Sequence, residues 1–263
     1  NLNLEILSDL PNDFKNQSVL DAKKDSLYFW HSKIEKDSLV FKITKDDYTT
    51  TKTIFLRKKV IDSLKINSNL TGVLNLKDTL TLISNNPVTK IDTSKILFLD
   101  KDSVNVKYQH ILKKSTNKIQ LLFDKKHRED YKLTLLPNAL TDIFETQNDT
   151  LKYNFKTKEP EDYGSISFTV NKKLATTVLV ELISENTNKI VQQITVTDNT
   201  SIVFDLLPPG KYIARAIVDT NKNNKWDAGN YLKKVQPEKV IYHPTIFNIR
   251  ANWDLPLEIF TVN

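Results

Sequence analysis

Short runs of alternating apolar and polar residues, separated by turn-forming residues, restrict the fold of this chain more than any other feature. Such runs cover 79–83, 95–99, 118–123, 131–135, 239–242 and 245–253. Each has the length of a strand, and no stretch keeps a helical apolar period through three turns. Strands that recur at this spacing, with turn residues between them, are typical of β-sandwiches. The pattern therefore predicts an all-β protein made of two or three tandem β-sandwich domains.

The turn-rich joins divide this strand pattern into three predicted domains. Residues 1–70 form a β-rich domain, which we interpret as a partial Ig-like unit that lacks its first strands. Residues 71–158 form the second domain, and a charged join separates them from a third domain at 159–263. Because the chain begins with Asn1 rather than Met and shows no signal peptide, we expect it to be a piece of a longer protein.

The composition argues against several classes of site and partner. The chain has no Cys, so disulfides, thiolate catalysis and Cys-ligated zinc are excluded. Its net charge of +6 would suit a nucleic-acid binder, but the basic clusters are short and are separated by acidic residues. A nucleic-acid binder would gather its cations on one face and interleave them with stacking aromatic residues. We therefore expect no nucleic-acid partner, and no apolar run is long enough for a membrane helix.

Oxygen-bearing side chains follow the strand that begins at Gly210, at the spacing of a calcium-binding loop. Such a loop takes ligands at positions 1, 3, 5, 7, 9 and 12, with the carbonyl oxygen at position 7. Counted from its first residue, these positions are Asp219, Asn221, Asn223, Lys225, Asp227 and Asn230. Asn224 at the turn tolerates a positive φ, whereas position 12 lacks the usual bidentate Glu. We expect weak calcium binding, at about 0.1–1 mM.

The same residues also fit a β-hairpin loop that holds no metal. In that alternative Asp219 and Asp227 accept backbone hydrogen bonds, and the ring of Trp226 covers the end of the sandwich. The sequence leaves both interpretations open.

The tripeptide Asp-Ser/Thr-aliphatic recurs through the first two thirds of the chain. Its hydroxyl residues are Ser26, Ser38, Ser63, Thr79, Ser103 and Thr150. Asp and Ser form turns through hydrogen bonds to their own backbone, so each tripeptide can simply end a turn and open a strand. The tripeptide also resembles the O-glycosylation sequon of Bacteroidota, which implies that these hydroxyl groups are glycan acceptors.

Two groups of segments resemble a known family. The segments DTLTLISNNPVTKID, YKLTLLPNALTDIF and NDTLKYNFKTK resemble the SbsA-type bacterial Ig-like domain found in Bacteroidota lipoproteins. The segments DYGSISFTV, FDLLPPGKYIARAIVDTNKNNKWDAGN and RANWD resemble the C-terminal region of the same lipoproteins. That region is similar to prealbumin-like and carboxypeptidase-regulatory-like sandwiches, so the resemblance implies an Ig-like domain followed by such a sandwich.

The resemblance covers about residue 71 to the end of the chain, and it implies a place in the cell envelope. It implies a protein anchored to the outer membrane, facing the periplasm or the surface, with outer-membrane or cell-surface proteins as partners. The membrane would be reached only through a lipid anchor outside this fragment, since the lipid-bearing Cys is absent.

No catalytic constellation follows from the spacing of the remaining residues. The four His residues stand far apart, and with four Gly residues there is no phosphate-binding loop or nucleophile elbow. We expect no enzyme, but a scaffold or accessory subunit of an envelope assembly. The alternative is a carbohydrate- or polymer-binding module that uses exposed Tyr and Trp, although core packing explains Trp30, Trp226 and Trp253 more simply.

Overall fold

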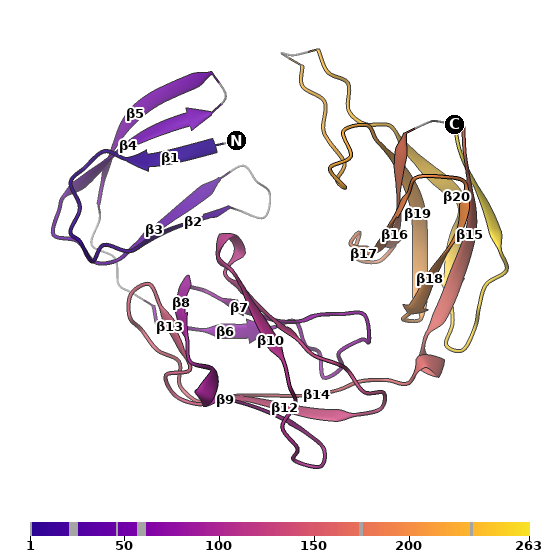
Figure 1. The fold of residues 1–263 in the computed structure, drawn as a ribbon, viewed down its shortest axis with the longest axis horizontal. Coiled ribbons are helices and arrows are strands. Elements are labelled where there is room, and N and C mark those ends of the chain that lie inside the picture. Colours follow the sequence, from indigo (N-terminus) through magenta and orange to yellow (C-terminus); the bar gives the residue numbers. More distant parts are fainter. Residues whose placement is uncertain (1, 21–25, 46, 57–61, 174–175, 232–233) are drawn as a thin grey trace. The chain divides into compact units, whose positions relative to one another are not determined.

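The computed structural model describes residues 2–20, 26–45, 47–56, 62–173, 176–231 and 234–263. Its regular structure is almost entirely strand, with three short 3-10 turns, which confirms the predicted all-β class (Figure 1). The chain divides into two compact units, each described by itself below. One comprises Asn1–Leu74 with Asp78–Thr157, and the other comprises Asn75–Lys77 with Lys158–Asn263. No helical segment in the described part of the chain has the length and apolar character to cross a bilayer.

The N-terminal part of the first unit contains one small sheet and one hairpin. The sheet has the order β1-β4-β5, and the hairpin pairs β2 with β3. The bounds are β1 (Leu2–Ile6), β2 (Asn16–Leu20), β3 (Leu27–His31), β4 (Ser38–Lys45) and β5 (Tyr48–Phe55). All these pairs are antiparallel, and Phe29 of the hairpin meets Phe41 of the sheet edge-on at 5.0 Å. Two strand layers therefore face each other here, as in a sandwich.

The rest of the first unit is a complete sandwich. One sheet has the order β10-β11-β7-β6, a second has the order β14-β12-β9, and β8 pairs with β13. The first sheet contains β6 (Ile66–Ser68), β7 (Leu80–Ser84), β10 (Gln109–Lys113) and β11 (Lys118–Leu122). The others contain β8 (Val88–Ile91), β9 (Ile96–Asp100), β12 (Asp130–Leu135), β13 (Leu140–Asp142) and β14 (Leu151–Lys156).

Alternation along these strands places one apolar face of each sheet in the core. In β11, Ile119 and Leu121 are buried while Lys118 and Leu122 are exposed, as a period of two requires. Phe98 lies at the centre of an aromatic group and is 2% exposed. The division at residues 70 and 71 stays a prediction, but β6 pairs with β7, so this strand belongs to a sheet of the central sandwich.

The second unit is also a two-sheet sandwich. One sheet has the order β18-β15-β21 and the other β17-β16-β19-β20; β21 runs parallel to β15, and the other pairs are antiparallel. The smaller sheet contains β15 (Gly164–Lys172), β18 (Thr200–Leu207) and β21 (Glu258–Val262). The larger one contains β16 (Thr177–Ser184), β17 (Ile190–Val196), β19 (Gly210–Asp219) and β20 (Val240–Ile249). Its core includes Phe168, Phe204, Ala214 and Ala216, all fully buried.

Two close contacts fix the ends of this sandwich. A Cβ atom on Gly164 would lie 2.6 Å from the carbonyl oxygens of Arg250 and Trp253, so only Gly fits where β15 begins. The hydroxyl of Tyr212 donates to the carbonyl oxygen of Pro208 at 2.6 Å, which fastens the turn before β19. Strand 239–242 and strand 245–253, expected as two, are one continuous strand, β20, with Pro244 inside it.

Candidate functional site

The loop between β19 and β20 brings together most of the predicted calcium ligands. Asp219 ends β19 and is fully buried. Its carboxylate accepts hydrogen bonds from the backbone N–H groups of Asn223 at 3.1 Å and Asn224 at 2.9 Å. Asn224 has a φ of 58°, so the chain turns sharply at the sixth position, as expected. The buried carboxylate of Asp219 therefore organises the start of the loop.

A ladder of side chains continues from Asp219. Asn221 Oδ1 accepts from the N–H of Asn223 at 3.1 Å, and Asn223 Oδ1 accepts from the N–H of Lys225 at 2.9 Å. The amide groups of both Asn residues donate to Asp227 Oδ2, at 2.5 Å and 2.6 Å. Four predicted ligands, from Asp219 to Asp227, are thus joined in one hydrogen-bond network. Lys225 takes part in this network through its backbone N–H, which donates to Asn223. The sequence predicted its carbonyl oxygen as the calcium ligand.

Asn230 lies differently, because it opens a second turn. Its backbone N–H donates to the carbonyl oxygen of Val235 at 2.8 Å, and the N–H of Val235 returns a hydrogen bond at 3.0 Å. The backbone of the expected position-12 residue is therefore engaged in a local pair of hydrogen bonds.

One carboxylate beside the loop, that of Glu238, was not among the predicted ligands. This side chain is buried and accepts hydrogen bonds from Thr220 N at 2.7 Å and Asp227 N at 3.0 Å. Its carbonyl oxygen also accepts from the indole N–H of Trp226 at 3.0 Å. No spacing rule places it there, because Glu238 approaches from the far end of the loop. It ties the two ends of the loop together.

The loop also packs on the outer face of the larger sheet. Asn224 accepts hydrogen bonds from Gln193 and Thr195, at 3.4 Å and 3.0 Å. Leu179 and Ile217 face away from the core in this sheet, and yet both are fully buried. Asn224 thus fastens the loop to β17, the strand next to β16. The metal-free interpretation expects the ring of Trp226 to cover the end of the sandwich, and this side chain is 47% exposed.

The oxygen atoms of this loop suit a hard cation only weakly. Asp219, Asp227 and two Asn amides are oxygen ligands of the kind that calcium takes, but only two of them carry charge. Over the described residues there is no group of three or more His, Cys, Asp and Glu side chains arranged for a metal ion. The geometry is compatible with a weak calcium site and with a metal-free loop whose polar groups are hydrogen-bonded to one another.

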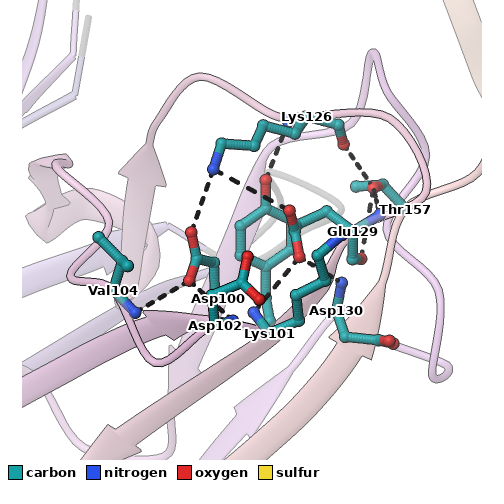
Figure 2. Close-up of polar contacts among 9 residues, drawn as sticks. Asp100, Lys101, Asp102, Val104, Lys126, Glu129, Asp130 and Thr157 are labelled. Carbon is teal, nitrogen blue, oxygen red and sulfur yellow. Dashed lines mark hydrogen bonds and ion pairs between the residues drawn. The ribbon is translucent and has the colours of Figure 1, made fainter.

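A second polar cluster, in the central sandwich, joins the end of β9 to the start of β12 (Figure 2). Lys126 Nζ lies 3.1 Å from Asp100 and 4.0 Å from Glu129, and both carboxylates are nearly buried. The N–H of Val104 and then Lys126 hold the pKa of Asp100 below its usual value, and the hydrogen bond to Asp100 raises the pKa of Lys126. Both partners stay charged, so this cluster is an ion pair that fixes a turn rather than an acid–base pair.

The hydroxyl residues of the repeated tripeptide occupy the positions that turn chemistry predicts. Ser26, Thr79 and Thr150 immediately precede β3, β7 and β14, and Ser38 is the first residue of β4. Ser63 lies before β6, whereas Ser103 lies in the turn after β9, with a φ of 60°. Ser26, Ser63, Ser103 and Thr150 are exposed, and Ser38 and Thr79 are partly buried. All six positions are consistent with turns, and the exposed hydroxyl groups are accessible for modification.

The aromatic candidates have separate local partners. Trp30 lies edge-on to Phe144, and Trp253 packs beneath Arg250 at 5.0 Å. His243 is buried among aromatic rings, and its Nδ1 accepts a hydrogen bond from the N–H of Thr245 at 3.2 Å. It is a core residue rather than a catalytic one.

An apolar groove, which no sequence motif indicated, lies in the N-terminal part of the first unit. It has a volume of about 480 Å³ between the β1-β4-β5 sheet and the β2–β3 hairpin. Its walls include Leu4, Leu27, Phe29, Phe41, Ile43 and Ile54. Between residues 2 and 56, the apolar side chains that the structure describes as buried are Val19, Leu39 and Phe41. The two layers therefore enclose little core and leave an apolar interior open.

Comparison with known proteins found no matching family model and no matching curated protein. Among solved structures, native alpha-2-macroglobulin from Escherichia coli (domains MG0-NIE-MG1) is 12% identical, with a TM-score of 0.32, over 68% of this chain and 71% of that one. The major pilin subunit BcpA of Bacillus cereus is 12% identical, with a TM-score of 0.26, over 92% and 88%. The Bacteroides ovatus glucan-utilisation protein SGBP-B is 11% identical, with a TM-score of 0.20, over 98% and 70%. Similarity this weak carries no argument about function.

Proposed function

We propose that this chain is a non-enzymatic interaction module, acting as a scaffold or accessory subunit of an outer-membrane or cell-surface assembly. The observation that carries this proposal is the open apolar groove beside β5, where Ile54 and Phe55 are 50% and 76% exposed. Large contiguous apolar surfaces on a folded soluble chain mark sites of contact. Placement in the envelope rests on the sequence resemblance to Bacteroidota lipoproteins, with anchoring through a lipid outside this fragment.

A pull-down from the native envelope tests this proposal. Tagged full-length protein is recovered in mild detergent, and its partners are identified by mass spectrometry. We expect one envelope protein in stoichiometric amount with the unaltered chain, and its loss with the variant Ile54→Lys. The matched control Ile246→Lys, which changes a similarly exposed residue of β20, should retain it. Recovery of the protein alone, in good yield, would contradict the proposal and favour a carbohydrate or polymer ligand.

We also propose that this module binds calcium and carries O-linked glycans. The loop from Asp219 to Asp227 binds calcium weakly, supported by the four oxygen-bearing side chains gathered there. The exposed hydroxyl groups of Ser26, Ser63, Ser103 and Thr150 carry O-linked glycans, supported by the repeated tripeptide and their exposure. The intact mass of natively expressed protein tests the second proposal, and a mass equal to that of the bare polypeptide would refute it.

A further inference from the structure

The groove beside β5 has the properties of a site for one more strand. β5 is eight residues long and lies at the edge of the β1-β4-β5 sheet, with β4 as its neighbour. The backbone N–H and C=O groups on its outer edge can form a further ladder. The interior-facing side chains beside this edge include Phe41, Ile43 and Ile54. An extended segment is thus the occupant that would satisfy both the backbone groups and the apolar wall.

The charges around the groove indicate what kind of strand would fit. Lys52 lies opposite Phe41 in the strand register, and Lys45 lies two residues from Ile43, so both share the face of the apolar wall. In the part of the chain that the structure describes, neither Lys has a carboxylate within ion-pair distance. Lys42, which points to the other face, pairs with Glu5 at 3.7 Å. On the face of the sheet that carries the apolar wall, two lysines therefore have no ion-pair partner among the described residues.

We propose that this groove binds an extended segment of a partner protein, about eight residues long, with apolar residues and flanking acidic residues on one face. This inference rests on the proposed interaction function and names the chemistry of the partner. The new strand pairs with β5, its apolar side chains enter the groove, and its carboxylates meet Lys45 and Lys52. A second copy of this chain fits less well, because a symmetric β5–β5 pair would bring the two copies of Lys52 together.

The test uses a designed peptide and the whole chain. The fluorescent peptide Thr-Glu-Thr-Val-Thr-Val-Thr-Glu-Thr is titrated and followed by anisotropy, beside a control with Lys in place of both Glu residues. We expect saturable binding of the acidic peptide, about tenfold tighter than the lysine peptide and weaker at high salt. The protein variant Lys45→Glu/Lys52→Glu should reverse this preference. Amide hydrogen exchange should slow in β5 when the acidic peptide is bound.

Several results would overturn the inference. These are equal affinity for both peptides, no change of preference in the charge-swapped variant, or no saturation at about 1 mM peptide. A concentration-dependent dimer that Ile54→Lys abolishes would assign the groove to a second copy instead. The outcome of this test is separable from that of the pull-down. If an envelope partner is lost with Ile54→Lys but no peptide binds, the proposed function stands, and only the proposal that the partner binds as an added strand is rejected.

Discussion

At the scale of single residues, the loop between β19 and β20 combines hydrogen bonds between near neighbours with hydrogen bonds from distant parts of the chain. The pattern of oxygen-bearing side chains from Asp219 to Asp227 was visible because these residues interact with neighbours two to six positions away. Glu238 closes the same loop from 18 residues beyond Thr220, and the loop rests on β17 through Asn224. Nothing in a single sequence specifies such long-range contacts, so they were missed.

Calcium should raise the melting temperature if the loop binds it. Binding to the folded state stabilises it by an amount that grows with the logarithm of the ligand concentration over its dissociation constant, so ~10 mM calcium should add about 1.5–3 kcal/mol. The variant Asp227→Asn keeps an oxygen acceptor for the Asn amides but removes one of the two charges, and it should lose most of this shift.

Magnesium at the same concentration is the control, since it requires near-octahedral geometry and gives up its water ligands reluctantly. Equal melting temperatures with and without calcium would settle the question in favour of the metal-free loop.

The ion pair in Figure 2 should shape the stability of the protein in acid. The pKa of Asp100 is lowered in the folded state, first by the N–H of Val104 and then by Lys126. Its stabilising contribution is therefore complete above the ordinary Asp value of about 3.9, and it disappears as the pH falls through the lower folded value. Asp100→Asn should reduce stability at neutral pH and flatten the loss of stability below about pH 4.

Urea unfolding at a series of pH values measures this effect. Asp102→Asn, at an exposed position of the same turn, serves as the control. Parallel acid profiles for Asp100→Asn and the unaltered chain would show that the pair contributes nothing.

At the scale of elements, alternation identified strands well, but their continuity depends on position in the sheet. The sequence suggested two strands, 239–242 and 245–253, on either side of Pro244. Pro cannot donate a hydrogen bond to a ladder. β20 lies at the edge of its sheet, where a missing N–H is tolerated, so the strand runs through. β16 is buried on both faces along nearly its whole length, which local alternation does not reveal.

Gly164 should not tolerate a larger side chain. Gly164→Ala would force its methyl group against two backbone oxygens and should cost about 1–3 kcal/mol in the free energy of unfolding. Gly210→Ala is the matched control, because the nearest atom to its added Cβ, Tyr212 Cε2, lies 3.8 Å away. Equal urea midpoints for the two variants would contradict the inference that backbone oxygens leave no room for a Cβ atom at Gly164.

A buried ion pair crosses the larger sheet of the second unit. Glu181 is 3% exposed and accepts a hydrogen bond from Arg215 Nε at 2.7 Å. Arg215→Leu leaves this carboxylate without its partner and should destabilise the chain by about 3 kcal/mol. The double variant Glu181→Leu/Arg215→Leu should recover most of that loss, as measured by urea unfolding. A double variant as unstable as Arg215→Leu would contradict this account.

At the scale of the whole molecule, the sandwich architecture was predictable, whereas the state of its N-terminal part was not. The two complete sandwiches have large contiguous cores, one around Phe98 and the other around Phe168. Residues 2–56 show the same strand patterns, and yet their two layers leave a groove open. A periodic sequence indicates which side of a strand is apolar, but not whether another layer covers it. That difference is the basis of the proposed function.

Site-specific photo-crosslinking in the native envelope tests the central claim most directly. A photoreactive amino acid replaces Phe55 beside the groove, or Val104 in an exposed turn of the central sandwich as the control. We predict that Phe55, but not Val104, crosslinks to one other envelope protein, and that the crosslinked peptide is an extended segment bearing acidic residues. The absence of any crosslink at Phe55 in well-expressed, folded protein would contradict the claim that this groove is an interaction site.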